Sequence, residues 1–328
     1  MANFIFLSAK NYISDLTLSV KHASNRVYIT CPVMTDDPAT HELVEALLAT
    51  ATRGVEVNMA VDAFTFAELG GYVFPLNRRN KASREAARMA DRLATASVSF
   101  HRLGDDYKLN PFAGVTHTKW CVVDDAVYSF GGTNLYEFGL SHVDYMLRCQ
   151  DSRLAQDLIN QQQKIITSDR QARAYHGYQS SFPLGTVYID SGQPGNSAIY
   201  ERACELASKA QKITLVSQYC PSGPLAALLR QKNARVYFNQ PINTSFYTRL
   251  FIYATMRRAH LRSLYKKQQY IHAKFIIFEM PSGQTIALTG SHNFSYGGVK
   301  FGTKEIALET TNRQVCRQLE EFLQKNIA

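Results

Sequence analysis

The feature that most constrains this chain is an internal repeat, in which one pattern of histidine, lysine, acid, glycine and asparagine occurs once in each half. The two copies are His117, Lys119, Asp124, Gly131 and Asn134, and then His272, Lys274, Glu279, Gly290 and Asn293. On an extended strand, residues two positions apart project from the same face, so each histidine is expected beside its lysine. The repeat therefore predicts a protein built from two similar halves.

The residue types in these two copies suit phosphodiester chemistry that needs no metal. One imidazole can attack phosphorus while the other protonates the leaving oxygen, and lysine ammonium groups and asparagine amides can hold the phosphoryl oxygens. A single H-x-K triplet arises by chance in many chains. Two copies, each followed by an acid and a G-x-x-N, are much more specific and predict one site that uses both.

The paired motifs resemble the HxKxxxxD and GSxN signatures of the phospholipase D superfamily. Glu279 stands where that family usually has aspartate, Gly132 stands where it often has serine, and a turn at Met280–Gln284 lengthens the second copy. The resemblance implies an α/β fold of two similar α/β sandwich halves related by pseudo-twofold symmetry. It implies catalytic roles for His117, Lys119, Asn134, His272, Lys274 and Asn293, and substrate contacts from Gly132, Thr133 and Ser291.

Two acids downstream of the motifs complete the predicted catalytic set. A histidine that attacks phosphorus needs an acceptor on its other ring nitrogen, which fixes the tautomer and stabilises the imidazolium. By the resemblance, Asp144 is expected to orient His117, and Glu305 to orient His272; the alternative is that either is an ordinary surface acid. Asp124 and Glu279 are expected to hold local structure at strand ends.

The other histidines are expected to stand outside the chemistry. His292 occupies a variable motif position and receives a structural interpretation. The rest show no ligand-like spacing: His22, His41, His101, His142, His176 and His260. We therefore predict no metal and no cofactor.

Strands and helices alternate along both halves. Strands are expected at 26–30, 55–61, 212–216 and 235–238, and helices at 38–53 and 223–232. Each motif is expected on a strand (120–123 or 275–278) that turns back into another (126–130 or 285–288). The predicted domains are 1–168 and 197–328, joined by a linker over 169–196 that is rich in Gln, Ser, Gly and Pro.

The cysteines and the apolar segments indicate a reducing, aqueous setting. The six cysteines lack metal-binding spacing and are expected to be reduced, mostly buried thiols. The apolar run at the N-terminus is too short for a signal peptide, and no run approaches the roughly eighteen apolar residues of a membrane span. We expect a cytoplasmic protein that associates peripherally with membranes.

Positive charge is concentrated before the second motif. The chain has a formal net charge of +9, and between Leu206 and Phe278 it contains twelve Lys or Arg and no Asp or Glu. Large apolar and aromatic residues mix with Arg257, Arg258 and Arg262 in a predicted helix that could lie in an anionic membrane interface, and these arginines are expected to bind substrate. The alternative is a helix packed on the core with a solvated basic face.

A similar mixture precedes the first motif. Aromatic and apolar residues are followed there by basic ones: Phe64, Phe66, Tyr72, Val73 and Phe74, then Arg78, Arg79, Lys81, Arg84, Arg88 and Arg92. Such surfaces would also attract a nucleic-acid backbone.

Three functions remain open. The first is a peripheral membrane phosphatidyltransferase or phospholipase that acts on glycerophospholipids through a phosphohistidine intermediate, because the GGTN and GSHN sequences and the segment 110–114 resemble bacterial cardiolipin synthases. The acceptor could be water, glycerol or a lipid. The alternative is a nuclease or phosphodiesterase of the same superfamily acting on nucleic acid. The intact motifs disfavour the third, a catalytically idle scaffold.

Overall fold

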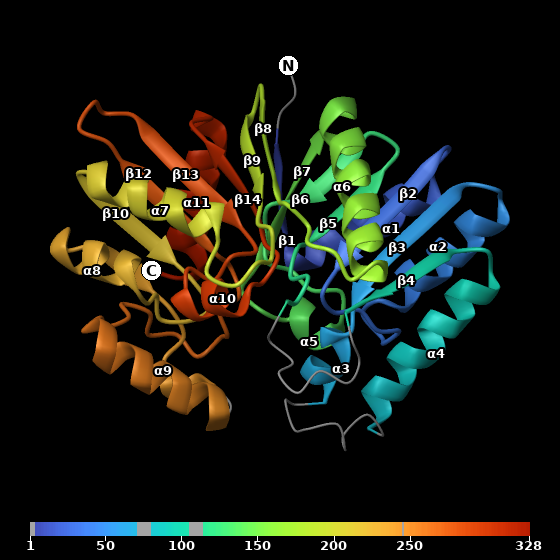
Figure 1. The fold of residues 1–328 in the computed structure, drawn as a ribbon, viewed down its shortest axis with the longest axis horizontal. Helices are drawn as coiled ribbons and strands as arrows, with labels where there is room; N and C mark the ends of the chain where they lie inside the picture. The colour runs from blue at the N-terminus through green and yellow to red at the C-terminus, as the bar shows by residue number, and fades with distance from the viewer. Residues whose placement is uncertain (1–3, 71–79, 105–113, 245) are drawn as a thin grey trace. The chain divides into compact units, whose positions relative to one another are not determined.

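The computed structural model describes residues 4–70, 80–104, 114–244 and 246–328 (Figure 1). The chain divides into two compact units. The first consists of residues 1–129, 133–141 and 146–176, and the second of residues 130–132, 142–145 and 177–328. In the described part of the chain, each unit is built on one seven-stranded sheet. The prediction of an α/β protein with two similar halves is confirmed.

The first sheet has the strand order β1-β7-β6-β5-β2-β3-β4. Its strands are β1 (Ile5–Ser8), β2 (Arg26–Cys31), β3 (Glu56–Asp62), β4 (Ser99–Leu103), β5 (Trp120–Val123), β6 (Ala126–Ser129) and β7 (Tyr145–Gln150). The helices are α1 (Ala9–Lys21), α2 (His41–Thr52), α3 (Phe64–Leu69), α4 (Lys81–Thr95), α5 (Glu137–Leu140) and α6 (Ser152–Arg170). β2, β3 and β4 are parallel, and β5 runs antiparallel to β2.

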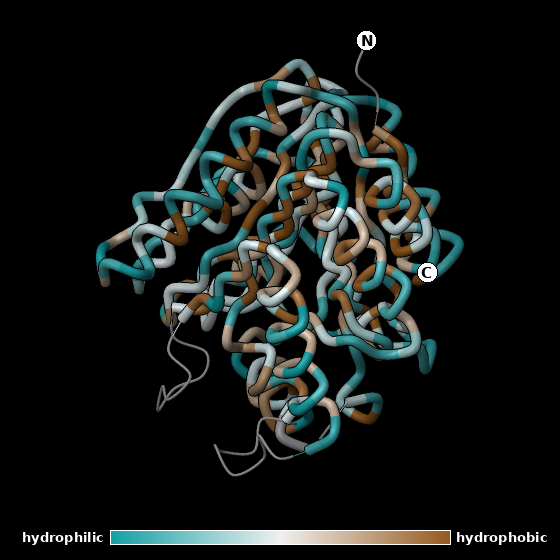
Figure 2. The backbone as a smooth tube through the Cα atoms, turned by 90° about the vertical axis from the view of Figure 1, so that its right-hand side faces the viewer, coloured by the Kyte–Doolittle hydropathy of each residue, from teal (hydrophilic) through white to brown (hydrophobic). Residues whose placement is uncertain are grey.

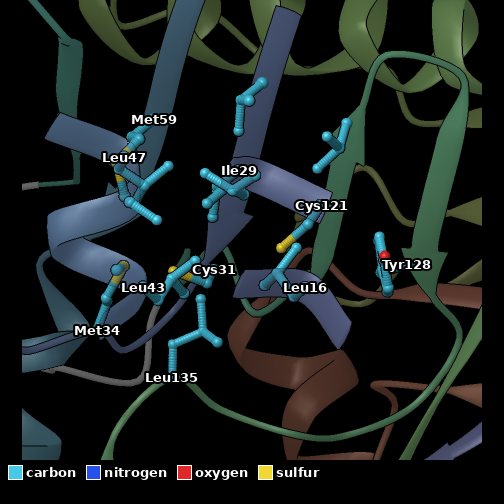
Figure 3. Packing of buried hydrophobic residues seen from close by; sticks show 14 of the residues in the cluster. Leu16, Ile29, Cys31, Met34, Leu43, Leu47, Met59, Cys121, Tyr128 and Leu135 are labelled. Atoms are coloured by element: carbon cyan, nitrogen blue, oxygen red, sulfur yellow. The ribbon is translucent and has the colours of Figure 1, made fainter. Parts of the chain in front are cut away.

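Side-chain alternation on these strands sets the two faces of the first sheet. Val57 and Met59 of β3 join the apolar cluster formed with α1, α2 and α4, as Figure 3 shows for part of it. Asn58, between them, points the other way and accepts a hydrogen bond from Gln162 of α6 at 2.9 Å. Because successive strand residues face opposite sides, one sheet can bury apolar residues against helices on both faces.

The second sheet has the order β11-β10-β12-β13-β14-β9-β8. Its strands are β8 (Tyr178–Phe182), β9 (Gly185–Ile189), β10 (Lys212–Val216), β11 (Arg235–Tyr237), β12 (Phe275–Glu279), β13 (Thr285–Gly290) and β14 (Ile306–Thr310). The helices are α7 (Ala198–Lys209), α8 (Pro224–Gln231), η2 (Pro241–Asn243), α9 (Phe246–Ala259), α10 (Tyr296–Phe301) and α11 (Arg313–Asn326). β10 and β11 are parallel and β12 is antiparallel to β10, which repeats the arrangement of β2, β3 and β5.

The helices of both units are amphipathic to differing degrees. In Figure 2, hydrophobic and hydrophilic residues alternate along the turns of the helices, as expected when one face of a helix packs on a sheet. The cysteines are all free, and five of the six are buried, as predicted. Among the described residues, we find no helix that is both long enough and apolar enough to span a bilayer.

Two short segments connect strands of the first unit but belong to the second. The backbone N–H of Val143 donates to the carbonyl of Tyr270 at 2.9 Å, and the N–H of His272 donates to the carbonyl of Val143 at 3.1 Å. Thr289 of β13 donates to the carbonyl of Phe130 at 2.7 Å. Residues 130–132 and 142–145 therefore complete the structure around the second motif.

The predicted elements need two corrections. The segment 169–196, expected as a linker, contributes β8 and β9 to the second sheet, because Val187, Tyr188 and Ile189 are buried there. The H-x-K residues lie just before β5 and β12 and not within them. The expected aromatic and basic residues at 72–74, 78 and 79, and most of the segment 110–114, lie outside the described residues.

Candidate active site

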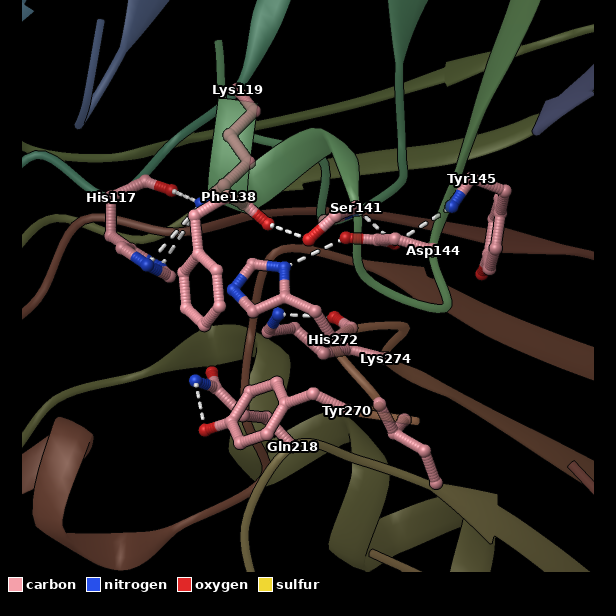
Figure 4. Close-up of polar contacts among 12 residues, drawn as sticks. His117, Lys119, Phe138, Ser141, Asp144, Tyr145, Gln218, Tyr270, His272 and Lys274 are labelled. Carbon is pink, nitrogen blue, oxygen red and sulfur yellow. Dashed lines mark hydrogen bonds and ion pairs between the residues drawn. The ribbon is translucent and has the colours of Figure 1, made fainter. Parts of the chain in front are cut away.

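The second motif contains a buried histidine–carboxylate pair. His272, 4% exposed, precedes β12, and its Nδ1 lies 2.7 Å from Oδ2 of Asp144 (Figure 4). Asp144, 3% exposed, also accepts hydrogen bonds from the backbone N–H of Tyr145 at 2.8 Å and of Gly132 at 3.2 Å. A carboxylate bonded to Nδ1 fixes the imidazole tautomer and leaves Nε2 to face a substrate.

This pairing differs from the sequence-based assignment. We expected Asp144 to orient His117 and Glu305 to orient His272. Instead, Asp144 belongs to the second unit and binds His272, whereas Glu305 accepts a hydrogen bond from the hydroxyl of Ser291. The reason is the path of residues 142–145, which pair with the backbone before His272; spacing along the chain cannot reveal this.

Lys274 is fully buried behind the same pair. Its ammonium group donates to the backbone carbonyl of His272, two residues earlier. A charge held out of water interacts with a phosphoryl oxygen much more strongly than a solvated one does. Lys274 is thus suited to stabilise negative charge beside His272.

Gly132 leaves no room for a side chain at this place. A Cβ atom there would lie 2.6 Å from the carbonyl oxygen of His272, 2.7 Å from Oδ2 of Asp144 and 2.9 Å from Nζ of Lys274. The departure from the serine common in the family therefore has a steric reason. Gly132 supports the pair through its backbone N–H.

The first motif repeats part of this geometry in its own unit. Lys119, 2% exposed, donates to the backbone carbonyl of His117 at 3.0 Å, as Lys274 does to His272. Its Nζ also lies 3.3 Å from Nε2 of His117. The ring of Phe64 meets that of His117 edge-on, with ring centroids 6.3 Å apart. In both motifs the lysine is buried beside its histidine, as the H-x-K spacing predicted.

The two motif asparagines share an unusual feature. Oδ1 of Asn134 and Oδ1 of Asn293 are both buried and have no hydrogen-bond partner among the described residues. A buried polar atom without a partner is costly, and such atoms in native proteins call for an explanation. An amide Oδ1 only accepts hydrogen bonds, so these two atoms suit a hydrogen-bond donor of a ligand and not a phosphoryl oxygen.

The other residues predicted to contact substrate differ in their exposure to solvent. Ser291 is fully buried; it donates to Glu305 and accepts from the N–H of Ile306 at 3.0 Å, so its hydroxyl is occupied within the protein. Thr133 is buried at 2% exposure. Arg257 and Arg258, in the last turn of α9, and Arg262 after it are exposed.

Asp124 and His292 make local backbone contacts of the kind expected of structural residues, and Glu279 lies at a strand end as expected. Asp124 accepts from the backbone N–H groups of Ser24, Asn25 and Arg26 at 2.8–3.1 Å. Its burial raises its pKa, but these three bonds outweigh that effect and the pKa is lowered. Glu279, at the end of β12, pairs with Lys212 at 3.3 Å. His292 is buried and accepts from the N–H of Phe294 at 2.8 Å.

Sequence reasoning missed His142. Its ring centroid lies 5.5 Å from that of His272 and 4.8 Å from that of Tyr270. Burial, with the charge of Lys274, lowers the pKa of His142 to about 4, so its ring is neutral above that pH. Its position two residues before Asp144, which places it on the same extended segment, was the available signal.

One group in the described part of the chain has metal-like spacing, and it lies away from the motifs in sequence. Asp36, His41 and Glu45 come within reach of one another, but Arg92 contacts Asp36 at 2.8 Å and also contacts Glu45. The arrangement is an exposed ion-pair network.

Comparison with known proteins supports the fold. Residues 16–166 match a family model described as cardiolipin synthase, PLD-like domain. No curated protein sequence matches the chain. Phosphatidylserine synthase from Haemophilus influenzae Rd KW20 has a similar structure, with a TM-score of 0.74 and 14% identity over 99% of this chain and 87% of that one.

Two further solved structures are similar. Polyphosphate kinase from Porphyromonas gingivalis gives a TM-score of 0.59 and 11% identity over 99% of this chain, which spans 50% of that protein. A phospholipase D family member, Nuc, from Salmonella typhimurium gives 0.37 and 15% identity over 50% of this chain and 93% of its own.

Each of the two similar α/β units holds a buried motif lysine and a G-x-x-N, residue types that are suited to binding phosphoryl oxygens. Residues 16–166 thus carry a domain of the cardiolipin synthase, PLD-like type, and the whole chain has a fold similar to that of phosphatidylserine synthase.

Proposed function

We propose that this protein is a phosphatidyltransferase or phospholipase of cardiolipin synthase type, which acts on glycerophospholipid phosphodiesters through a phosphohistidine intermediate. The observation that carries the proposal is the buried pair of His272 and Asp144, with the ammonium group of Lys274 beside it. The match of residues 16–166 to the cardiolipin synthase, PLD-like model supports the lipid substrate class.

The proposed reaction has two steps. Nε2 of His117 attacks phosphorus, the bond to the leaving alcohol breaks, and the protonated His272 gives that oxygen a proton. His272 then takes a proton from water or an acceptor alcohol, whose oxygen attacks phosphorus and breaks the bond to His117. The acid–base role falls to His272 because Asp144 stabilises its charged form.

We also propose that the protein meets the membrane through α9 and the residues beside it. Nine large hydrophobic side chains in the described part of the chain are exposed, and five of them fall within 242–264: Ile242, Leu250, Phe251, Tyr253 and Leu264. This region lies within the stretch that has no acid, and it contains the exposed Arg257, Arg258 and Arg262. Exposed apolar side chains mixed with arginines suit an anionic bilayer surface.

The first test is a lipid product assay. Purified protein is incubated in EDTA with phosphatidylglycerol liposomes, with and without glycerol or ethanol, and the lipids are identified by mass spectrometry. Cardiolipin or a transphosphatidylated lipid is the result expected of a transferase, and phosphatidic acid that of a hydrolase. Activity that EDTA abolishes and a divalent ion restores would contradict the two-histidine mechanism.

Variants test whether both histidines are needed for the reaction. His117→Ala and His272→Ala are each expected to lower turnover by at least about 10³-fold, because one removes the nucleophile and the other the acid–base group. The matched control is His176→Ala, an exposed histidine outside both motifs, which should retain wild-type turnover.

The second candidate is a phosphodiesterase that acts on nucleic acid. The net charge of +9 favours it, since a basic surface attracts phosphate backbones. If no lipid product forms but single-stranded DNA is cleaved, and both histidine variants lose that cleavage, this candidate replaces the first.

A further inference from the structure

Two buried side chains outside the motifs hold the residue directly before each motif histidine. Asp62, the last residue of β3, accepts a hydrogen bond from the backbone N–H of Thr116 at 2.7 Å. Asn239, just after β11, accepts one from the backbone N–H of Ile271 at 2.8 Å. The two side chains are 4% and 0% exposed. β3 and β11 hold corresponding places beside β2 and β10, so the arrangement occurs once in each unit.

We propose that Asp62 and Asn239 are a matched pair of positioning residues, which fix the backbone ahead of His117 and His272 so that each imidazole is held for the reaction. The inference rests on the proposed function, because it takes both histidines to be the reacting groups. It goes further by assigning roles to residues that no motif contains.

We call each positioning side chain, together with the backbone groups that it bonds, a clamp. The first clamp, formed by Asp62, needs a carboxylate. Both oxygens of Asp62 are used as acceptors: Oδ2 from Thr116, and Oδ1 from the backbone N–H of Phe64 at 2.8 Å. The ring of Phe64 packs edge-on against that of His117. One side chain thus holds both the backbone before the histidine and the aromatic ring beside it. Asparagine has a single oxygen and could accept at only one of the two places.

The second clamp needs an amide. Nδ2 of Asn239 donates to the carbonyl of Ile271 at 2.7 Å and to that of Gln218 at 2.9 Å, while its Oδ1 accepts from Ile271. The amide therefore pairs with both backbone groups of Ile271, as a neighbouring strand would. Aspartate is of the same size but cannot donate, and its charge would face two carbonyl oxygens.

The amide of Asn239 also reaches the surroundings of His272 by a second route. Gln218, whose backbone carbonyl Asn239 holds, donates from its side chain to the hydroxyl of Tyr270 at 3.2 Å. Figure 4 shows this bond between Gln218 and Tyr270. Tyr270 lies two residues before His272, and its ring lies 4.8 Å from that of His142 between centroids. Asp62 thus bonds to the backbone of Thr116 and Phe64, and Asn239 bonds to the backbone of Ile271 and Gln218.

The decisive experiment exchanges the two residue types without changing their size. Asp62→Asn and Asn239→Asp are each expected to lower kcat on bis(p-nitrophenyl) phosphate, a soluble phosphodiester, by about 10- to 100-fold while KM stays within about twofold, because misplacing a reacting group costs rate more than binding. The matched control is Asn58→Asp, a buried amide on the same strand as Asp62 that contacts Gln162 of α6. It should keep wild-type kcat.

A second measurement tests the hydrogen bond between Asn239 and Ile271 and does not depend on enzyme activity. Amide hydrogen exchange at Ile271 should be at least about tenfold faster in Asn239→Leu, which removes the acceptor, and near wild type in Asn239→Asp, which retains it. Wild-type kcat in both size-matched variants, or unchanged exchange at Ile271 in Asn239→Leu, would overturn the positioning role. A wild-type protein inactive on lipid and on the soluble diester would refute the proposed function instead, while the exchange data would still decide the clamp.

Discussion

The proposed chemistry of this protein uses a small number of buried polar side chains. Lys119, Lys274, Asp144 and His272 are each at most 4% exposed, in surroundings where charges interact strongly and unpaired groups are costly. Small changes in hydrogen bonding at these residues should therefore have large effects on rate. The clearest case is the carboxylate of Asp144, which has bonds to one imidazole and two backbone N–H groups.

Replacing Asp144 with asparagine should reduce turnover while leaving the fold intact. Asparagine is of the same size, but it can offer its N–H₂ group to Nδ1 of His272 and so favour the wrong tautomer. The expected loss in kcat is about 10³- to 10⁴-fold. Initial rates on bis(p-nitrophenyl) phosphate, with a thermal unfolding curve for each variant, check it. A turnover close to that of the wild type would contradict the role given to Asp144.

Asp124→Asn makes the same exchange at the acid of the first motif. It should lower the free energy of unfolding and leave turnover unchanged. Losing part of the set of backbone bonds to Ser24, Asn25 and Arg26 should cost about 1–2 kcal/mol of unfolding free energy, with kcat unchanged. The folded pKa of Asp124 is lowered, so its contribution is present above the ordinary value of 3.8 and is lost as pH falls through the folded value. Urea unfolding should show a smaller difference in unfolding free energy between the wild type and Asp124→Asn at pH 3 than at pH 7.

At the level of elements, sequence patterns predicted the sheets well and the active-site pairing poorly. The strands at 120–123 and 212–216 have the predicted bounds, because β-branched and apolar runs bounded by turn residues depend on local sequence. β8 and β9 were missed because the Gln, Ser, Gly and Pro residues of 169–196 are typical of a linker, although β9 itself contains Thr186, Val187, Tyr188 and Ile189, which favour a strand. The pairing of Asp144 with His272 depends on a long-range backbone path that periodicity does not contain.

The junction of β9 and α7 supplies a prediction about pH. Asp190 accepts from the hydroxyl of Ser197 at 2.6 Å and from the N–H of Ile199 at 3.2 Å, and so caps α7. Burial, with the nearby charge of Glu305, raises its pKa to about 7. The folded state thus holds a proton that the unfolded state releases near pH 3.8, and stability is lost as pH rises toward 7.

Asp190→Asn should remove that pH dependence. Between pH 5 and pH 7 the wild type should lose up to about 1.4 kcal/mol of unfolding free energy per pH unit relative to the variant. Urea unfolding of both proteins at several pH values measures this difference. Parallel pH profiles would show that Asp190 is not the titrating group.

At the scale of the whole molecule, the uneven distribution of charge should govern encounters with substrate. The acid-free stretch from 206 to 278 contains twelve of the 36 basic residues, and α9 within it presents apolar side chains to solvent. Electrostatic attraction to an anionic bilayer weakens with salt, whereas apolar insertion weakens much less. Binding should therefore show both a salt-sensitive and a salt-resistant part.

Reversing charge on α9 should weaken membrane binding without unfolding the protein. The double variant Arg257→Glu and Arg258→Glu is expected to lose about 1 kcal/mol of binding free energy per arginine removed, measured by flotation with phosphatidylglycerol liposomes. The control reverses two exposed residues on another helix of the same unit, Arg313 and Lys325 of α11. Equal loss in both double variants would point to net charge alone and against a docking role for α9.

The crossing of residues 130–132 and 142–145 into the second unit has a consequence for how the gene could be divided. A fragment that begins at residue 177 would carry His272 and Lys274 but would leave behind the carboxylate of Asp144 and the backbone N–H of Gly132. The second half is thus not self-sufficient, although it has its own sheet. Separately expressed fragments should regain activity only by complementation.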